Sequence, residues 1–415
     1  RRMDSTKTDE QAQLEDELAH HLDFLSEEVG PRPVGSPANL AALRYISGLF
    51  SDAGLTLSEQ RFDCPDWTCA STQLELDGKP LTAAANTYSI PCDVTAPTAV
   101  VSTIAELEST DLSGKIGVLC GELTQSALTP KNLHLYTIER DQQIIALLEA
   151  KQPAALITVN LGYPSLERLI EDRDLAIPSA TVAADVGLSL AHRAGADVHL
   201  RIDSRRAPSF SANIVGRTAS PERRRIVLCA HYDTKIETPG AYDNASGVSA
   251  LLTLMKRLLA DPPGVDLEFV AFSDEEYFGQ DDAAYMRDSG DHMGSVLATI
   301  NMDAIGEYLG ANTIAIMAHS EAFEARVKAI TANFPGLKWV DPWPMSDHSI
   351  FAWRGVPCLA ISSYFAGMPR LAHQPYDTQA WISPARLAEV VTLVEAIVRA
   401  IAAEPLTWSR PPAEA

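Results

Sequence analysis

The sequence predicts a three-layer α/β/α fold with a smaller, β-rich module inserted into it. From about residue 205 onward, apolar strand-like runs alternate with amphipathic helical stretches. Between residues 64 and 204 the sequence changes to short strands and loops rich in Thr, Ser, Pro and Gly. Side chains that bind metals follow the ends of several strand-like runs, where ligands gather in α/β sheets. We therefore expect a discontinuous main domain, residues 1–63 and 205–415, and an inserted domain, residues 64–204.

Composition narrows the class of protein and its partners. The 415 residues are 46% hydrophobic and 21% charged, which is typical of a globular chain long enough for more than one core. A net charge of −22 repels phosphates, so no nucleic acid and no membrane surface is expected as a partner. The six cysteines form no C-x-x-C pair and are predicted to be free thiols, which with the polar N-terminus favours a reducing, cytoplasmic location. The oligomeric state is not predicted.

The first 63 residues predict two helices and a strand. Residues 11–29 place leucines and a valine on one helical face and acids on the other. Residues 31–35 interrupt this pattern with two prolines and a glycine. Ser36 then has the right side chain to cap a second helix, with Pro37 in its first turn and Gly54 after its end. Alternating residues 55–62 predict a strand.

The remaining elements are predicted from apolar runs and helical periodicity. Within the insert, a turn at 111–115 leads into a buried strand, a helix surrounds Ile144 to Leu148, and further strands are expected at 154–159, 177–182 and 198–202. In the main domain, strands are expected at 209–215, 225–231, 266–272, 295–300 and 358–361. Helices are expected at 244–259, 280–288, 321–332 and 384–402.

Residues with metal-binding side chains follow these strands in order. His231 and Asp233 end the first apolar run, and they are followed along the chain by Asp243, by Glu275 with Glu276, by Asp303, and by His373 with Asp377. Each motif alone has an ordinary explanation, such as acids at a helix N-terminus or an aspartate in a turn. Two imidazoles and several carboxylates at one sheet edge instead predict two zinc-like ions about 3.5–4 Å apart. A spare glutamate would then act as a base, and Asp233 would orient the His231 ring.

The order His-x-Asp, Asp-Asn-Ala-Ser-Gly, Glu-Glu, Asn-x-Asp and His-x-x-x-Asp-Thr resembles the co-catalytic zinc aminopeptidases of the bacterial leucine-aminopeptidase type, in the MH clan. This resemblance implies a zinc-exopeptidase fold and two zinc ions, although cobalt or manganese would tolerate the same ligands. It implies that Asp243 bridges the ions, with His231 and Asp303 on one and Glu276 and His373 on the other. It also implies that Glu275 is the general base that deprotonates the attacking water, and that the Asp243–Asn244 peptide bond is cis.

The resemblance extends beyond the ligands. Residues 30–37 (GPRPVGSP) look like that family's entry to its first helix, residues 346–348 (SDH) like its loop lining the cleft, and residues 211–216 (SANIVG) like its strand before the metal centre. Residues 113–118 and 177–182 make the insert similar to a protease-associated domain. Such an insert would limit access for large folded substrates. Some relatives have a tyrosine just before the last ligand histidine, where this chain has Ala372. His348 or Tyr364 is the expected substitute.

The predicted function is an aminopeptidase that releases N-terminal residues from peptides. A carboxypeptidase or dipeptidase of the same clan is the alternative, because Arg354 and Arg370 lie near the ligand loops and a guanidinium suits a substrate carboxylate. A glutaminyl-cyclase-like enzyme with one zinc is less compatible with a complete ligand set. A non-catalytic binding module on the same scaffold would be expected to lack ligands, and Glu275 is also present.

Overall fold

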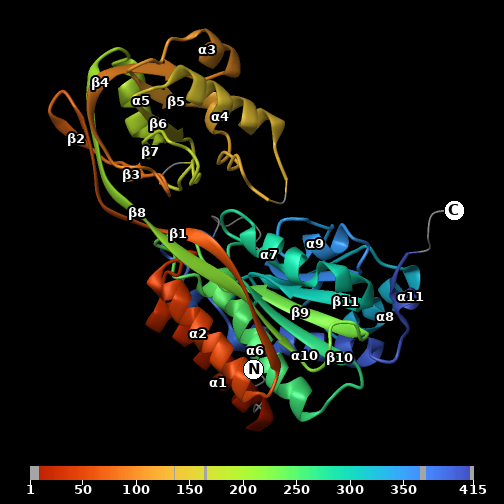
Figure 1. Cartoon of the computed structure of the whole chain (residues 1–415). Coiled ribbons are helices and arrows are strands. Elements are labelled where there is room, and N and C mark those ends of the chain that lie inside the picture. The colour runs from red at the N-terminus through yellow and green to blue at the C-terminus, as the bar shows by residue number, and fades with distance from the viewer. Residues whose placement is uncertain (1–8, 135, 163–165, 365–370, 412–415) are drawn as a thin grey trace. The chain divides into compact units, whose positions relative to one another are not determined.

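The computed structural model describes residues 9–134, 136–162, 166–364 and 371–411. These form two compact units, one of residues 1–63 and 210–415 and one of residues 64–209. The insert had been expected to end at residue 204, which lies inside a long strand, β8 (Asp197–Arg217). Another long strand, β1 (Thr56–Leu76), runs through the first boundary. Figure 1 shows both strands leading from one unit to the other.

The larger unit is built on a mixed sheet in the order β13-β12-β14-β11-β9-β10-β8. Its four central strands, β14, β11, β9 and β10, are parallel, whereas β12 and β8 run antiparallel to their neighbours β14 and β10. Besides β8, the strands of this sheet are β9 (Arg225–His231), β10 (Asp266–Phe272), β11 (Val296–Met302), β12 (Ala311–Met317), β13 (Lys338–Trp339) and β14 (Cys358–Tyr364). Because the central strands are parallel, their carboxyl ends meet at one edge.

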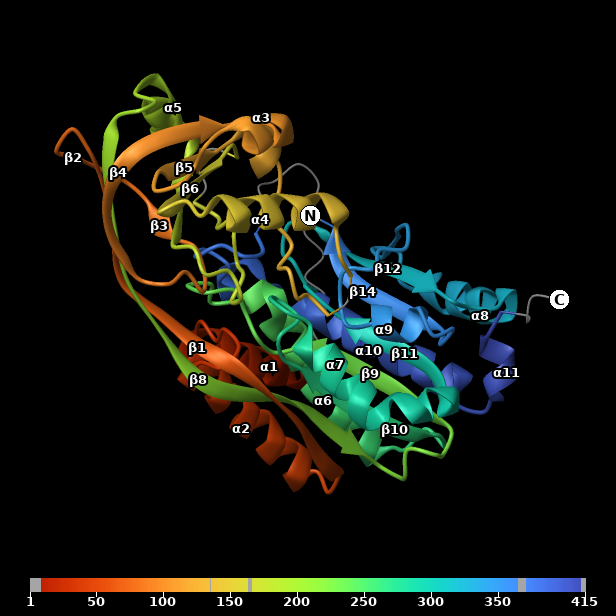
Figure 2. The same cartoon turned by 45° about the horizontal axis from the view of Figure 1, so that its top comes forward.

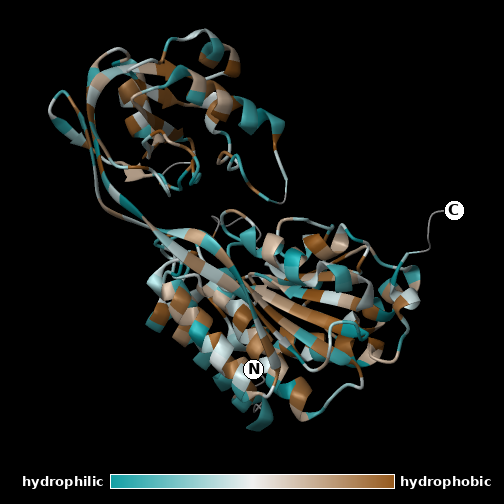
Figure 3. Cartoon of the chain, in the orientation of Figure 1, coloured by the Kyte–Doolittle hydropathy of each residue, from teal (hydrophilic) through white to brown (hydrophobic). Residues whose placement is uncertain are grey.

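Helices cover both faces of this sheet, which confirms the three-layer architecture (Figure 1). All seven residues of β9 are buried, as expected for a strand between two helical layers. Ile226, Leu228 and Ala230 face the main core. Residues of five helices share this core: α1 (Asp9–Asp23), α2 (Pro37–Asp52), α6 (Ser246–Ala260), α8 (Glu321–Thr331) and α10 (Pro384–Ile401). On the other face, Phe272 packs on Tyr285 of α7, which packs on Phe351 of α9. Figure 3 shows these central strands as predominantly hydrophobic.

The helices of the larger unit largely match the expected positions. Expected residues 11–29 divide into α1 (Asp9–Asp23) and a wider helical turn, Phe24–Val29. Ser36 caps α2 through its hydroxyl, which accepts a hydrogen bond from the N–H of Asn39, as predicted. The other helices are α6 (Ser246–Ala260), α7 (Gln280–Ser289), α8 (Glu321–Thr331), α9 (Ser349–Ala352), α10 (Pro384–Ile401) and α11 (Leu406–Ser409). Strands β12 and β13 had not been predicted.

The smaller unit contains its own parallel strands, β4 (Cys92–Val101), β5 (Ile116–Leu119), β6 (Ala155–Asn160) and β7 (Ser179–Ala183). Short strands β2 (Lys79–Leu81) and β3 (Ala84–Ala85) pair with β1 and β7, and the N-terminal half of β8 pairs with β4. Helices α3 (Ile104–Ser109), α4 (Glu139–Lys151) and α5 (Ala184–His192) accompany them (Figure 2). A separate apolar core forms between these elements, around Leu119, Ile144 and Leu156.

All six cysteines are free thiols. Among the described residues, no helix combines the length and the apolar composition needed to cross a bilayer.

Candidate metal centre

Five buried or half-buried side chains meet in two adjoining triads at the carboxyl edge of the larger sheet. Each triad contributes one ligand atom per residue, with all three atoms within 4.8 Å of one another: His231, Asp243 and Asp303 in one, and Asp243, Glu276 and His373 in the other. Asp243 belongs to both. Its Oδ1 lies 3.1 Å from Nε2 of His231, and its Oδ2 lies 3.2 Å from Nε2 of His373. One carboxylate therefore faces both imidazoles, each through a different oxygen.

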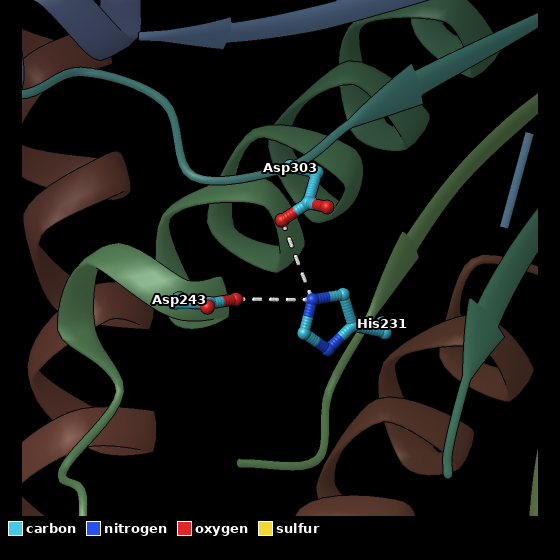
Figure 4. Close-up of side chains that lie close together, drawn as sticks. All are labelled: His231, Asp243 and Asp303. Atoms are coloured by element: carbon cyan, nitrogen blue, oxygen red, sulfur yellow. Dashed lines mark hydrogen bonds and ion pairs between the residues drawn. The ribbon is translucent and has the colours of Figure 1, made fainter. Parts of the chain in front are cut away.

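The outer carboxylates complete the triads. Nε2 of His231 lies 3.3 Å from Oδ1 of Asp303 (Figure 4), and Nε2 of His373 lies 3.0 Å from Oε2 of Glu276. Tetrahedral zinc with bonds of about 2.0–2.2 Å separates its ligand atoms by roughly 3.3–3.6 Å. The distances within both triads are close to that separation. The donor set of imidazole nitrogens and carboxylate oxygens therefore fits zinc in size and in chemistry.

Buried polar atoms without partners also fit a cation. Oε1 of Glu276 is buried and accepts no hydrogen bond. The triads contain three carboxylates and two imidazoles. The amine of Lys235, a nearby cation, donates to the main-chain oxygen of Glu276 and not to its carboxylate in this bond. Carboxylates buried together without a cation are costly, because each disfavours the ionisation of the others. Metal ions at the two triads would remove this cost.

Parallel strands deliver the outer ligands to this edge. His231 is the last residue of β9, and Asp303 directly follows β11, where its N–H donates to the carbonyl of Ile361 on β14. Glu276 follows β10, after Asp274, whose φ is +100°. His373 itself has φ +65°. Two of the turns that present ligands therefore use backbone conformations that residues other than glycine rarely adopt.

The segment Asp243 to Gly247 holds the bridging carboxylate at the start of α6. The amide of Asn244 donates to the carbonyl of Met302 and accepts from the N–H groups of Gly247 and Ala304, so it joins this segment to both sides of Asp303. A Cβ at Gly247 would lie 2.1 Å from the oxygen of Met302. Only glycine allows this approach. The Asp243–Asn244 bond is cis, which confirms that prediction.

Asp377 fixes the bridging residue from its other side. Its two carboxylate oxygens accept the N–H groups of Tyr242 at 2.7 Å and Asp243 at 3.1 Å. Burial raises the pKa of Asp377 to about 7, and the two N–H groups oppose that rise. The sequence had placed Asp377 in the last motif without assigning it this role.

Asp233 and Glu275 are the residues for which the sequence predicted roles other than metal binding. Oδ1 of Asp233 faces Nδ1 of His231 at 3.5 Å, the ring nitrogen that points away from the triad, and its Oδ2 accepts the N–H of Glu276. Glu275 is half-buried beside the triads. Burial raises the pKa of its carboxyl, and the negative charges of Asp303 and Glu276 add to this rise, while the charge of His231 opposes it.

The expected substrate-contacting residues have mixed positions. His348 is fully buried, with Nδ1 3.2 Å from the amide nitrogen of Asn301 and Nε2 2.8 Å from the carbonyl oxygen of Trp343. Both ring nitrogens are thus occupied within the protein, and its contact with a substrate stays a prediction. Tyr364 ends β14, but its side chain lies outside the described part of the chain, as does Arg370.

A third acidic group, not predicted from the sequence, lies nearby. Oxygens of Asp281, Asp282 and Asp347 lie within 4.8 Å of one another, and all three residues are buried. Burial raises the pKa of each of the three carboxyls, and nearby carboxylates add to the rise. The pKa of Asp347 rises to about 8, although the charge of His231 opposes the rise. Asp281 and Asp282 are adjacent and Asp347 lies in a distant segment, and no sequence pattern indicates that the two segments meet.

Comparisons with known proteins agree with this fold and site. Residues 213–398 match the model of "Peptidase family M28". Aminopeptidase YwaD of Bacillus subtilis is 25% identical over 399 residues, which cover 90% of this chain and 82% of that protein. A probable lipoprotein aminopeptidase of Mycobacterium tuberculosis, LpqL, is 25% identical over 277 residues, 64% of this chain and 53% of that protein.

Solved structures show the same fold over nearly the whole chain. BSAP, a zinc aminopeptidase from Bacillus subtilis, superposes with a TM-score of 0.75 at 22% identity, covering 92% of this chain and 94% of its own. An aminopeptidase from Aneurinibacillus sp. strain AM-1 gives a TM-score of 0.73 at 22% identity, covering 96% and 94%. A three-layer α/β fold with paired imidazole–carboxylate triads at its strand ends defines a metal-dependent hydrolase. Over residues 213–398 the chain is similar to peptidase family M28.

Proposed function

We propose that this protein is a two-zinc aminopeptidase that releases N-terminal residues from peptides. The single observation that carries the proposal is Asp243, whose two oxygens face the Nε2 atoms of His231 and His373 at 3.1 and 3.2 Å. That arrangement suits one carboxylate shared between two metal ions. The aminopeptidase names of YwaD and BSAP support the substrate class.

His231, Asp243 and Asp303 would hold one zinc, and Asp243, Glu276 and His373 the other. Bound there, two zinc ions would supply Lewis acidity toward the scissile carbonyl and lower the pKa of water. Asp233 would hold the His231 ring with Nε2 directed at its zinc, since its Oδ1 faces the opposite nitrogen. The Asp377 carboxylate holds the main chain of the bridging residue.

Glu275 would act as the general base and acid. It is half-buried, directly precedes the ligand Glu276 and belongs to neither triad. It would take a proton from the attacking water at a carboxylate oxygen and return it to the leaving amine.

Metal content and substrate ends test this proposal together. Protein purified without chelator is expected to contain two equivalents of zinc and to cleave peptides with a free amino end but not those with an acetylated one. Cleavage that instead requires a free carboxyl end would indicate a carboxypeptidase. One equivalent with cyclisation of N-terminal glutamine would indicate a glutaminyl cyclase, and no bound metal with no activity on adding zinc would contradict an enzyme of this kind.

A further inference from the structure

Arg32 is a fully buried arginine in the loop before α2, and its guanidinium contacts main-chain carbonyl groups rather than carboxylates. Its Nε donates to the carbonyl of Tyr232 at 2.6 Å, and its Nη2 donates to Gly240 at 3.0 Å. Its Nη1 donates to Pro239 at 2.8 Å and to Leu25 at 3.1 Å. Burying a charge is expensive unless hydrogen bonds satisfy it. The hydrogen bonds of Arg32 to main-chain carbonyls offset this cost.

The carbonyls that Arg32 binds belong to the segments that carry the triads. Tyr232 directly follows His231, and the main-chain N–H of Arg32 also donates to the hydroxyl of Thr234 at 2.9 Å. Gly240 lies three residues before Asp243. One side chain therefore ties the end of β9 to the loop that presents the bridging carboxylate. It thereby holds the backbone next to each partner of the 3.1 Å His231–Asp243 pair, at Tyr232 and at Gly240.

The loop at Gly240 has little freedom to compensate for loss of this tie. Gly240 has φ +63°, and a Cβ there would lie 2.2 Å from Cγ2 of Thr234 and 2.5 Å from the main-chain oxygen of Asp243. The main-chain N–H of Arg32 binds Thr234 and its guanidinium binds Gly240, so Arg32 holds these two residues next to each other. A shift of the loop would therefore move Asp243 directly.

We propose that Arg32 is a positioning residue for metal binding: it sets the separation of His231 and Asp243 and thereby the affinity of both zinc sites. This inference rests on the proposed two-zinc function. Arg32 touches no ligand side chain in any of these hydrogen bonds, so it acts through the main chain. Burial lowers its pKa to about 10, which leaves it a cation at neutral pH, close to the acids Asp377 and Asp233.

The positive charge and the geometry of Arg32 predict opposite effects on metal affinity. A cation near the site repels Zn²⁺, so removing only its charge would tighten binding. Removing the hydrogen bonds would loosen the ligand geometry and weaken binding. Arg32→Lys keeps the charge and loses the planar set of donors, whereas Arg32→Met loses both. A positioning role predicts that both variants bind zinc more weakly.

Zinc affinity is the measurement, made on the full chain by competition with a chromophoric chelator. Both Arg32 variants are expected to lose about 10–100-fold in zinc affinity, the range found when groups supporting metal ligands are removed. Arg225→Met is the matched control, because Arg225 is also buried and donates to Glu268, Pro221 and His292 at the far end of β9 from His231. It is expected to lower the unfolding temperature without changing zinc affinity.

The outcomes separate this inference from the proposed function. Wild-type protein that binds no zinc would contradict the proposed function itself. Wild-type protein that binds two zinc ions, with Arg32→Lys equal to it or Arg32→Met tighter, would overturn the positioning role alone. If Arg32→Met does not fold, Arg32→Lys decides, because it keeps the charge that the buried position requires.

Discussion

The main-chain N–H of Asp243 donates to Oδ2 of Asp377 at 3.1 Å, so the carboxylate of Asp377 holds the backbone of a residue far from it in the sequence. The N–H of Tyr242 occupies the other oxygen at 2.7 Å. Each oxygen of Asp377 therefore has a donor that belongs to the bridging segment. The Asp243 side chain is left free of this pair and faces the two histidines.

Asp377→Asn is expected to weaken zinc binding. An amide at this position turns one acceptor into a donor, which would face a buried N–H and leave it unsatisfied at a cost of about 1–3 kcal/mol. The loop would shift to relieve this contact, and zinc affinity should fall roughly 10–100-fold. Chelator competition measures it. Asp341→Asn, at an exposed position, is the control, and equal affinities in the two variants would contradict the role of Asp377.

Glu275→Gln separates catalysis from metal binding. The variant keeps the size of the side chain but cannot accept and return a proton. Peptidase activity should fall about 10²–10⁴-fold, the usual contribution of general acid–base catalysis. Zinc content should remain at two equivalents, because Glu275 belongs to neither triad. Steady-state kinetics at saturating zinc, together with metal analysis, tests this, and a variant that keeps most of its kcat would exclude Glu275 as the base.

Much of this fold could be predicted because its pattern is local. The apolar run that ends at His231 is a strand with every residue buried, and the Ser36 cap and Pro37 start a helix as expected. The Asp243–Asn244 cis bond followed from the resemblance and is present. The motifs also predicted which residues would meet at the sheet edge, since parallel strands bring their ends together.

What the sequence did not predict depends on contacts between distant segments. Arg32 reaches Tyr232 and Gly240 across about 200 residues, and no local pattern distinguishes a buried arginine from an exposed one. The meeting of Asp281 and Asp347 is equally non-local. Strand β12 (Ala311–Met317) was not predicted, because an apolar run of this length fits a buried helix segment as well as a strand.

Gly240→Ala is expected to disturb both stability and the metal centre. An alanine at φ +63° is strained, and its Cβ would also overlap Thr234 and the main-chain oxygen of Asp243. Gly264→Ala is a matched control, because Gly264 has φ +84° but nothing lies within 4 Å of an added Cβ. The control should lose about 1–2 kcal/mol of unfolding free energy from strain alone.

Denaturant unfolding and zinc titration of both glycine variants give the comparison. Gly240→Ala should lose more unfolding free energy than the control, with at least about 1 kcal/mol added for overpacking. It alone should bind zinc more weakly. Similar losses in the two variants, with unchanged zinc affinity, would show that the loop before Asp243 tolerates movement.

His21 makes the stability of the larger unit depend on pH, independently of the metal centre. The residue is buried in α1, where its Nδ1 lies 2.7 Å from the hydroxyl of Tyr45. Burial lowers the pKa of His21 to about 4, and the charge of His20 adds to the effect. The folded state therefore keeps this imidazole neutral over a pH range in which the unfolded chain protonates it.

The sign of the effect follows from proton uptake. Between pH 6.5 and about 4 the unfolded state binds a proton that the folded state does not, so His21 destabilises the fold progressively as pH falls through this range. The full effect is on the order of 3 kcal/mol at the acid end. His21→Gln removes the titration and should flatten unfolding free energy against pH between 6.5 and 4. An unchanged slope in His21→Gln would show that His21 stays solvated in the fold.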